Sequence, residues 1–111
     1  MKFQFIGKTK LKVIKQTVEG TKRDSAILSV QYENGAEVVW IFNGKVLSNT
    51  DENENKEWFS FDTYEANGMV QQDLLIDVLL DSHQGIYTIQ VSKDGCTAID
   101  TIYLSVVNPE L

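Results

Sequence analysis

Cysteine and proline are the residue types that this chain has least of. Its 111 residues include one cysteine, Cys96, and one proline, Pro109. A single cysteine excludes a disulfide bond within the chain, which makes the sequence compatible with a reducing compartment. Pro109 lies in the short tail 108–111, where proline commonly ends a strand and begins a linker.

Long apolar runs and histidine are also scarce. No stretch approaches the roughly 18 apolar residues that a membrane span needs, and the start of the chain alternates lysine with apolar residues. A single histidine, His83, supplies no second imidazole for a zinc site. A nucleophilic pair of Cys96 and His83 remains open by counting alone, although we expect the two to lie in different parts of the fold. We therefore predict no enzymatic activity, no metal and no cofactor.

Positive charge is in the minority. The chain has 10 basic and 16 acidic residues and a net charge of −6. Residues 1–23 hold seven of the basic residues and one acidic residue, a local balance of +6. Because neutralisation of phosphate charge supplies most nucleic-acid affinity, this composition predicts no nucleic-acid partner.

What the sequence does contain is alternation of apolar and polar residues in short segments separated by turns. Helix signals are nearly absent. This predicts an all-β sandwich that forms one domain over 1–107, followed by a linker or tail at 108–111. The expected strands cover 2–6, 10–18, 25–31, 37–42, 46–47, 58–61, part of 69–80, 86–91 and 97–107.

Two motifs carry a family resemblance. The first is Trp40-Ile-Phe-Asn-Gly-Lys45, and the second combines Leu74-Leu-Ile76 with His83-Gln-Gly-Ile-Tyr-Thr-Ile89. Together they resemble the I-set immunoglobulin domains of intracellular muscle proteins of the titin, myosin-binding protein C and myomesin type. The resemblance covers nearly the whole chain and identifies a fold more strongly than a function.

The resemblance implies an immunoglobulin-like β-sandwich of two antiparallel sheets with Greek-key connections and no disulfide bond. Aliphatic residues stand at the two positions that hold cysteines in disulfide-bonded members of the fold. His83 stands where the family usually has aspartate, so the carboxylate contact at this corner is either lost or replaced by a histidine contact. The expected core residues are Leu28, Trp40, Leu74, Ile76, Tyr87 and Ile89.

Alternation along three strands predicts an apolar outer face. If Trp40 and Phe42 face the core, their neighbours face outward, and the same parity applies to the two strands near the end of the chain. Apolar patches of this kind often mark partner sites, although a neighbouring domain or loop could also cover this one. The residues expected on this protein-binding face are Val39, Ile41, Ile86, Thr88 and Tyr103.

Two charged segments are further candidates for contacts. Lys8, Lys10 and Lys12 alternate with apolar residues and form a basic stripe, which either protects an edge strand from pairing or docks on an acidic filament. The acidic segment 51–57 resembles the start of a calcium-binding loop, but Lys56 occupies the position that needs glycine. We favour a solvated acidic loop, which is also a possible contact surface for a basic partner.

These features predict a non-enzymatic structural and protein-binding module of a cytoplasmic, sarcomeric multidomain protein. Its expected partner is a filament protein or another immunoglobulin or fibronectin-type domain, and a homodimer through an edge strand is possible. The alternative is a recognition domain of an extracellular, phage or bacterial surface protein that lacks its disulfide bond.

Overall fold

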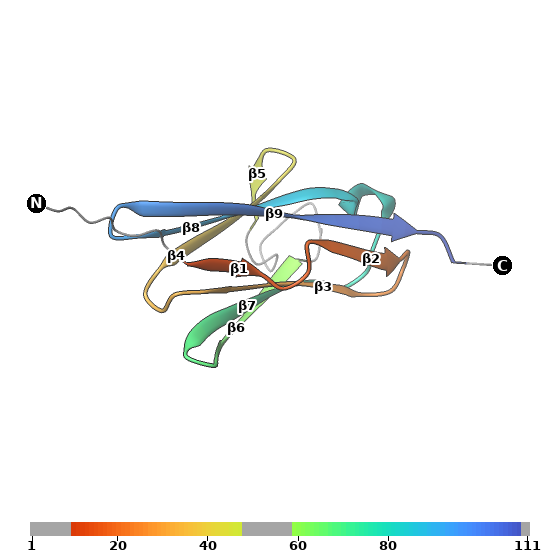
Figure 1. Ribbon diagram of the computed structural model, residues 1–111. Coiled ribbons are helices and arrows are strands. Elements are labelled where there is room, and N and C mark those ends of the chain that lie inside the picture. Colours follow the sequence, from red (N-terminus) through yellow and green to blue (C-terminus); the bar gives the residue numbers. More distant parts are fainter. Residues whose placement is uncertain (1–9, 48–58, 110–111) are drawn as a thin grey trace, which may run out of the picture.

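The computed structural model describes residues 10–47 and 59–109, which form two packed β-sheets (Figure 1). One sheet has four strands in the order β1-β3-β7-β6, and the other has five in the order β2-β9-β8-β4-β5. The predicted strand at 2–6, Lys8 and the acidic segment 51–57 lie outside the described residues. The elements are β1 (Leu11–Val13), β2 (Thr17–Thr21), β3 (Ala26–Tyr32), β4 (Glu37–Phe42), β5 (Lys45–Val46), β6 (Phe59–Ala66), β7 (Met69–Ile76), the 3-10 helix η2 (Asp81–His83), β8 (Gly85–Lys93) and β9 (Cys96–Val107).

This strand order is that of an immunoglobulin sandwich, so the predicted fold class is confirmed. One pair departs from the expected antiparallel pairing: β2 runs parallel to β9, which makes the five-stranded sheet mixed. Within the described ranges, no helix is long and apolar enough to cross a membrane.

The prediction of one continuous strand over 10–18 is wrong. β1 pairs with β3 in the four-stranded sheet, whereas β2 pairs with β9 in the other sheet. Between them the chain crosses the edge of the sandwich, and Gln16 holds the crossing in place. The side-chain Nε2 of Gln16 donates to Asp100 Oδ1 (2.9 Å) and to the Thr101 backbone carbonyl (2.8 Å). The backbone carbonyl of Gln16 accepts from the Tyr103 N–H (2.9 Å).

The strand predicted at 58–61 is also longer than expected, because β6 continues to Ala66 and pairs with β7 along its whole length. Residues 62–65 are exposed on this edge strand. The alternation of apolar and polar residues therefore does not predict the second half of β6.

The core lies between the sheets. Trp40 and Ile89 are cross-strand partners on β4 and β8, and Leu28 and Leu74 are partners on β3 and β7. The Trp40 indole N–H donates to Gln72 Oε1 (2.6 Å), which links the two sheets and gives the buried indole a partner. All six predicted core residues are at most 2% exposed: Leu28, Trp40, Leu74, Ile76, Tyr87 and Ile89.

The corner before β8 is organised by Tyr87 and His83. The Tyr87 hydroxyl donates to the His83 carbonyl (2.6 Å), the backbone contact expected of a tyrosine corner. His83 is 2% exposed, its Nδ1 accepts from the Leu80 N–H (2.9 Å), and its ring meets Phe59 edge-on at a centroid distance of 5.5 Å. A histidine contact therefore replaces the carboxylate contact at this corner.

Gly85 follows this corner at a backbone angle φ of +146°, which L side chains rarely adopt. A Cβ there would lie 3.0 Å from Phe42 Cε1, and the Phe42 ring is stacked on Tyr87 at 4.0 Å. We expect Gly85→Ala to lower the free energy of unfolding by about 2 kcal/mol, measured by denaturant titration. Gly68→Ala is the control, since Gly68 also has a positive φ but open space around it. Equal losses in both variants would show that the contact with Phe42 has no cost.

Candidate protein-binding face

The outer surface of the five-stranded sheet is built by cross-strand register. Ile41 lies opposite both Val46 and Thr88, and Ile86 lies opposite Tyr103. Since paired residues point to the same side of a sheet, the alternating positions of β4, β5, β8 and β9 form one surface. We call this surface the uncharged face; its residues are Val39, Ile41, Val46, Ile86, Thr88, Gln90, Ile99, Thr101 and Tyr103.

Four apolar side chains on this face are well exposed: Val46 (66%), Ile99 (60%), Ile86 (58%) and Tyr103 (41%). Val39, Ile41 and Thr88 are half-buried among them. The structure thus brings together all five residues expected on this surface. Sequence reasoning missed Val46 and Ile99. Ile99 lies four residues before Tyr103 on β9 and therefore points to the same side, so extending the alternation to the start of that strand would have identified it.

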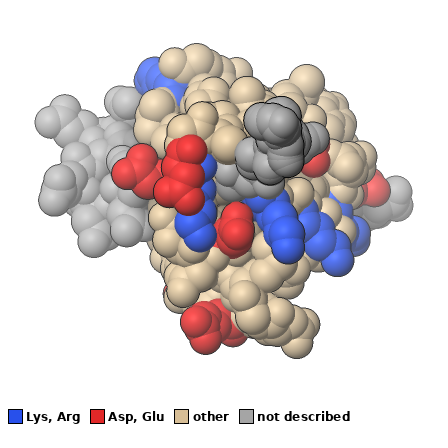
Figure 2. Space-filling view, turned by 60° about the vertical axis from the view of Figure 1, so that its left-hand side comes forward, with Lys and Arg blue, Asp and Glu red and all other residues tan. Residues whose placement is uncertain are grey.

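Charged residues that also point outward from this sheet lie at the ends of the face. Glu37 begins β4 at one end, and Glu19 lies on β2 opposite Ser105 near the other. In Figure 2, acidic and basic side chains mingle in a band across the middle of the view. The upper part of this view is largely uncharged, apart from one basic group at its upper left.

The basic stripe does not join this face. Lys12 lies on β1 opposite Gln31, at the edge of the four-stranded sheet, and Lys10 precedes β1. Both are exposed. The lysines were expected on a strand that continued to Val18. The break after β1 instead assigns Lys12 to the opposite sheet.

The outer surface of the four-stranded sheet is polar. Asp62 lies opposite Asp73, and the Tyr64 hydroxyl donates to Asp73 Oδ2 (2.9 Å). This hydrogen bond, together with burial and the charges of the two carboxylates, raises the pKa of Tyr64 above its usual value. Gln71 Nε2 donates to the other oxygen of Asp73 (3.0 Å). Such a network suits a hydrated surface, so the two outer faces of the sandwich differ in kind.

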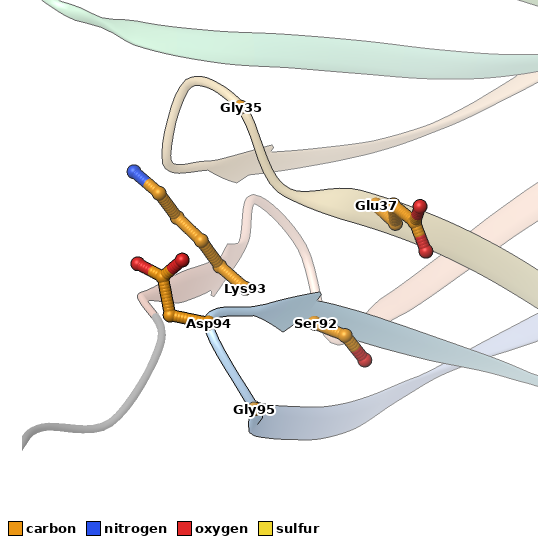
Figure 3. A pocket seen from close by; sticks show the side chains of 6 residues that line it. All are labelled: Gly35, Glu37, Ser92, Lys93, Asp94 and Gly95. Atoms are coloured by element: carbon orange, nitrogen blue, oxygen red, sulfur yellow. The ribbon is translucent and has the colours of Figure 1, made fainter.

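A polar hollow of about 330 Å³ lies at one end of the sandwich, lined by Gly35, Glu37, Ser92, Lys93, Asp94 and Gly95. Figure 3 shows Lys93 extending from the β8–β9 hairpin toward the turn that contains Gly35. Its Nζ donates to the Asn34 carbonyl (3.0 Å) and lies 3.9 Å from Glu33 Oε2. Lys93 therefore ties two turns together.

Neither His83 nor Cys96 contributes to a shared site. They flank opposite ends of β8, whose nine residues span roughly 27 Å at the usual rise per residue. This separation excludes the nucleophilic pair that counting had left open. Among residues 10–47 and 59–109, no three side chains of His, Cys, Asp or Glu are grouped so as to hold a metal ion.

Comparison with known proteins gives structural matches alone. No protein-family model and no curated protein sequence matches the chain. A crystal structure of Dpr2 Ig1–Ig2 in complex with DIP-Theta Ig1–Ig3 is similar with a TM-score of 0.75 and 17% identity over 89% of this chain. The chain spans 32% of the length of that matched chain.

Two other solved structures match over most of their own length. The complex of titin M10 with an obscurin-like 1 Ig mutant gives a TM-score of 0.65 and 16% identity, covering 94% of this chain and 100% of the matched chain. The ZIG-8 IG1 homodimer gives 0.69 and 18%, covering 86% and 81%. At such identities the likeness shows the immunoglobulin fold.

Proposed function

We propose that this chain is a non-enzymatic structural and protein-binding immunoglobulin module of a cytoplasmic, sarcomeric multidomain protein. In this proposal residues 1–107 form the I-set domain and 108–111 a linker or tail. The observation that carries the binding role is the uncharged face. Exposed apolar patches on soluble domains often mark protein interfaces, and interface cores are depleted of charged residues.

The structural neighbours support a protein partner. The three structures described above are a complex of Dpr2 with DIP-Theta, a complex of titin with an obscurin-like Ig domain, and a homodimer. The motifs around Trp40 and Tyr87 favour the muscle-protein setting, because they resemble the I-set domains of titin and its relatives. A filament protein or another immunoglobulin or fibronectin-type domain is the partner class that fits both.

The spacer role rests on the pairing of β2 with β9. The chain enters this ladder at Thr17, opposite Tyr103, and β9 ends at Val107, opposite Thr21. Pulling these two ends apart loads the parallel ladder along its length, so several hydrogen bonds must break together. This geometry suits a domain under tension.

The alternative is a recognition domain of an extracellular, phage or bacterial surface protein without its disulfide bond. The Dpr2 and titin complexes are similar to this chain at 17% and 16% identity, so this likeness does not separate the two proposals. The flanking sequence distinguishes the two: a signal peptide supports the alternative, whereas adjacent cysteine-free immunoglobulin or fibronectin-type repeats support the sarcomeric module.

The binding role predicts the result of a pull-down from muscle lysate. The double variant Ile41→Lys with Tyr103→Glu should lose most of the captured partner, because it places charges on two strands of the uncharged face, β4 and β9. The control is Ile27→Lys, since Ile27 is 52% exposed on the outer face of the other sheet. Capture that is equal for both variants and the wild type would refute the role of this face.

A further inference from the structure

The uncharged face has features that identify the kind of surface it fits. None of its nine residues is charged, although the chain as a whole carries a net charge of −6. Four of its apolar side chains are at least two-fifths exposed. By contrast, the outer surface of the other sheet displays Lys12, Asp62 and Asp73.

Charge limits what an acidic chain can bind. When two copies of one chain associate, each charged group in a two-fold contact can meet groups of its own sign, which is unfavourable. A contact through the uncharged face avoids this, because Glu19 and Glu37 lie at its far ends. The face is thus a part of the described surface on which two copies can meet without placing carboxylates against one another.

The size and shape of the uncharged face also suit a contact between two copies of the chain. The five strands of this sheet have two to twelve residues each, and at 3.4 Å per residue and about 4.8 Å between strands its whole outer surface has a footprint of roughly 550 Å², of which the uncharged face is the central part. The relief of the side chains increases the accessible area toward the ~800 Å² per partner that a stable interface buries. Two sheets of equal twist also stack well face to face, at about 30°.

Resting on the proposed binding role of this face, we infer that its partner is a second copy of this chain, joined face to face by a two-fold axis near Thr88. The contact buries Ile86 and Ile99 close to the axis and Val46 on the edge strand β5. It differs from dimerisation through an edge strand, which would leave the uncharged face in solvent.

Sedimentation equilibrium of the purified chain tests this inference. From about 1 µM to about 1 mM, the weight-average mass should rise from 12.6 kDa toward twice that value. Ile86→Lys and Ile99→Lys should each weaken association by about tenfold or more. Ile27→Lys should leave it unchanged, because Ile27 is as exposed as Ile86 but lies on the opposite sheet. Circular dichroism of each variant checks that the fold is kept.

Two further measurements separate this contact from others. Raising the salt from about 50 mM to about 500 mM should leave the dimer unchanged or slightly tighter, since screening reduces repulsion between two acidic chains. Amide NMR shifts on dilution should concentrate on β4, β8 and β9. Shifts confined to β2 or β6, or a dimer that survives both lysine variants, would identify an edge contact and overturn the inference.

A chain that stays monomeric at every concentration would also overturn it. That result alone would leave the proposed binding role intact, provided that lysate capture still depends on Ile41 and Tyr103. Conversely, if a face-to-face dimer forms but lysate capture is insensitive to these residues, the proposed capture of a filament partner fails and the self-contact stands.

Discussion

Replacement of His83 by alanine should lower the free energy of unfolding by about 3 kcal/mol. The change removes the acceptor of the Leu80 N–H, and an unsatisfied buried donor costs about 1–3 kcal/mol. It also removes the edge-on contact with Phe59, worth about 0.5–1.5 kcal/mol, and leaves a cavity where a side chain is now 2% exposed. Denaturant titration followed by tryptophan fluorescence measures the loss.

His83→Asn is the matched control for the hydrogen bond. The asparagine Oδ1 can take the place of Nδ1 and accept from the Leu80 N–H, but it supplies no ring for Phe59. We expect the asparagine variant to recover about 1 kcal/mol or more of the stability that alanine loses. If the two variants are equally stable, the backbone contact is not what His83 contributes to this corner.

A proline at Val18 should weaken the domain both at equilibrium and under force. The Tyr103 N–H donates to the Gln16 backbone carbonyl, and the Lys22 N–H donates to the Val107 carbonyl. The even-numbered residues of β2 therefore direct their backbone N–H and C=O groups toward β9 and form the hydrogen bonds of this ladder. Val18 belongs to this set and is half-buried against the core. Val18→Pro should cost about 3 kcal/mol and clearly lower the unfolding force when the domain is pulled by its ends.

Glu19→Pro controls for the effect of proline itself. By the same alternation the Glu19 N–H points away from β9, at the open edge of the sheet, where proline is tolerated. We expect it to keep the unfolding force near that of the wild type. A wild-type domain that opens at negligible force would contradict the spacer role. Equal weakening by both prolines would show that the β2–β9 ladder does not carry the load.

The sequence predicts the centre of this fold well because its signals there are local and mutually consistent. Trp40 lies in a run of alternating residues followed by an Asn-Gly turn, and Tyr87 lies in a strand with the same alternation. The six predicted core residues are buried because alternation assigns them to one side of each strand. The same parity indicated the outward residues Ile41 and Ile86.

The errors arise where pairing depends on partners far along the chain. Inward positions are odd-numbered on β1, as at Val13, but even-numbered on β2, as at Val18. This change from odd to even inward positions marks the break between β1 and β2. Treating 10–18 as one alternating strand overlooks it. The second half of β6 gave no such signal, since the exposed residues 62–65 are held by pairing with β7. Contacts such as that of Gln16 with Asp100 depend on the tertiary fold, which alternation does not encode.

The parallel pairing of β2 with β9 also has a consequence for biosynthesis. β2 lies near the beginning of the described residues, but its partner β9 is the last of their strands and leaves the ribosome after all the others. The four-stranded sheet can assemble once β7 has emerged, whereas the five-stranded sheet must wait for β9. Until β9 has emerged, Val18 and its neighbours on β2 cannot pair with it and stay exposed to solvent. Such late, non-local pairing is slow and exposes the nascent chain to aggregation. We therefore expect this domain to fold after, not during, its own translation.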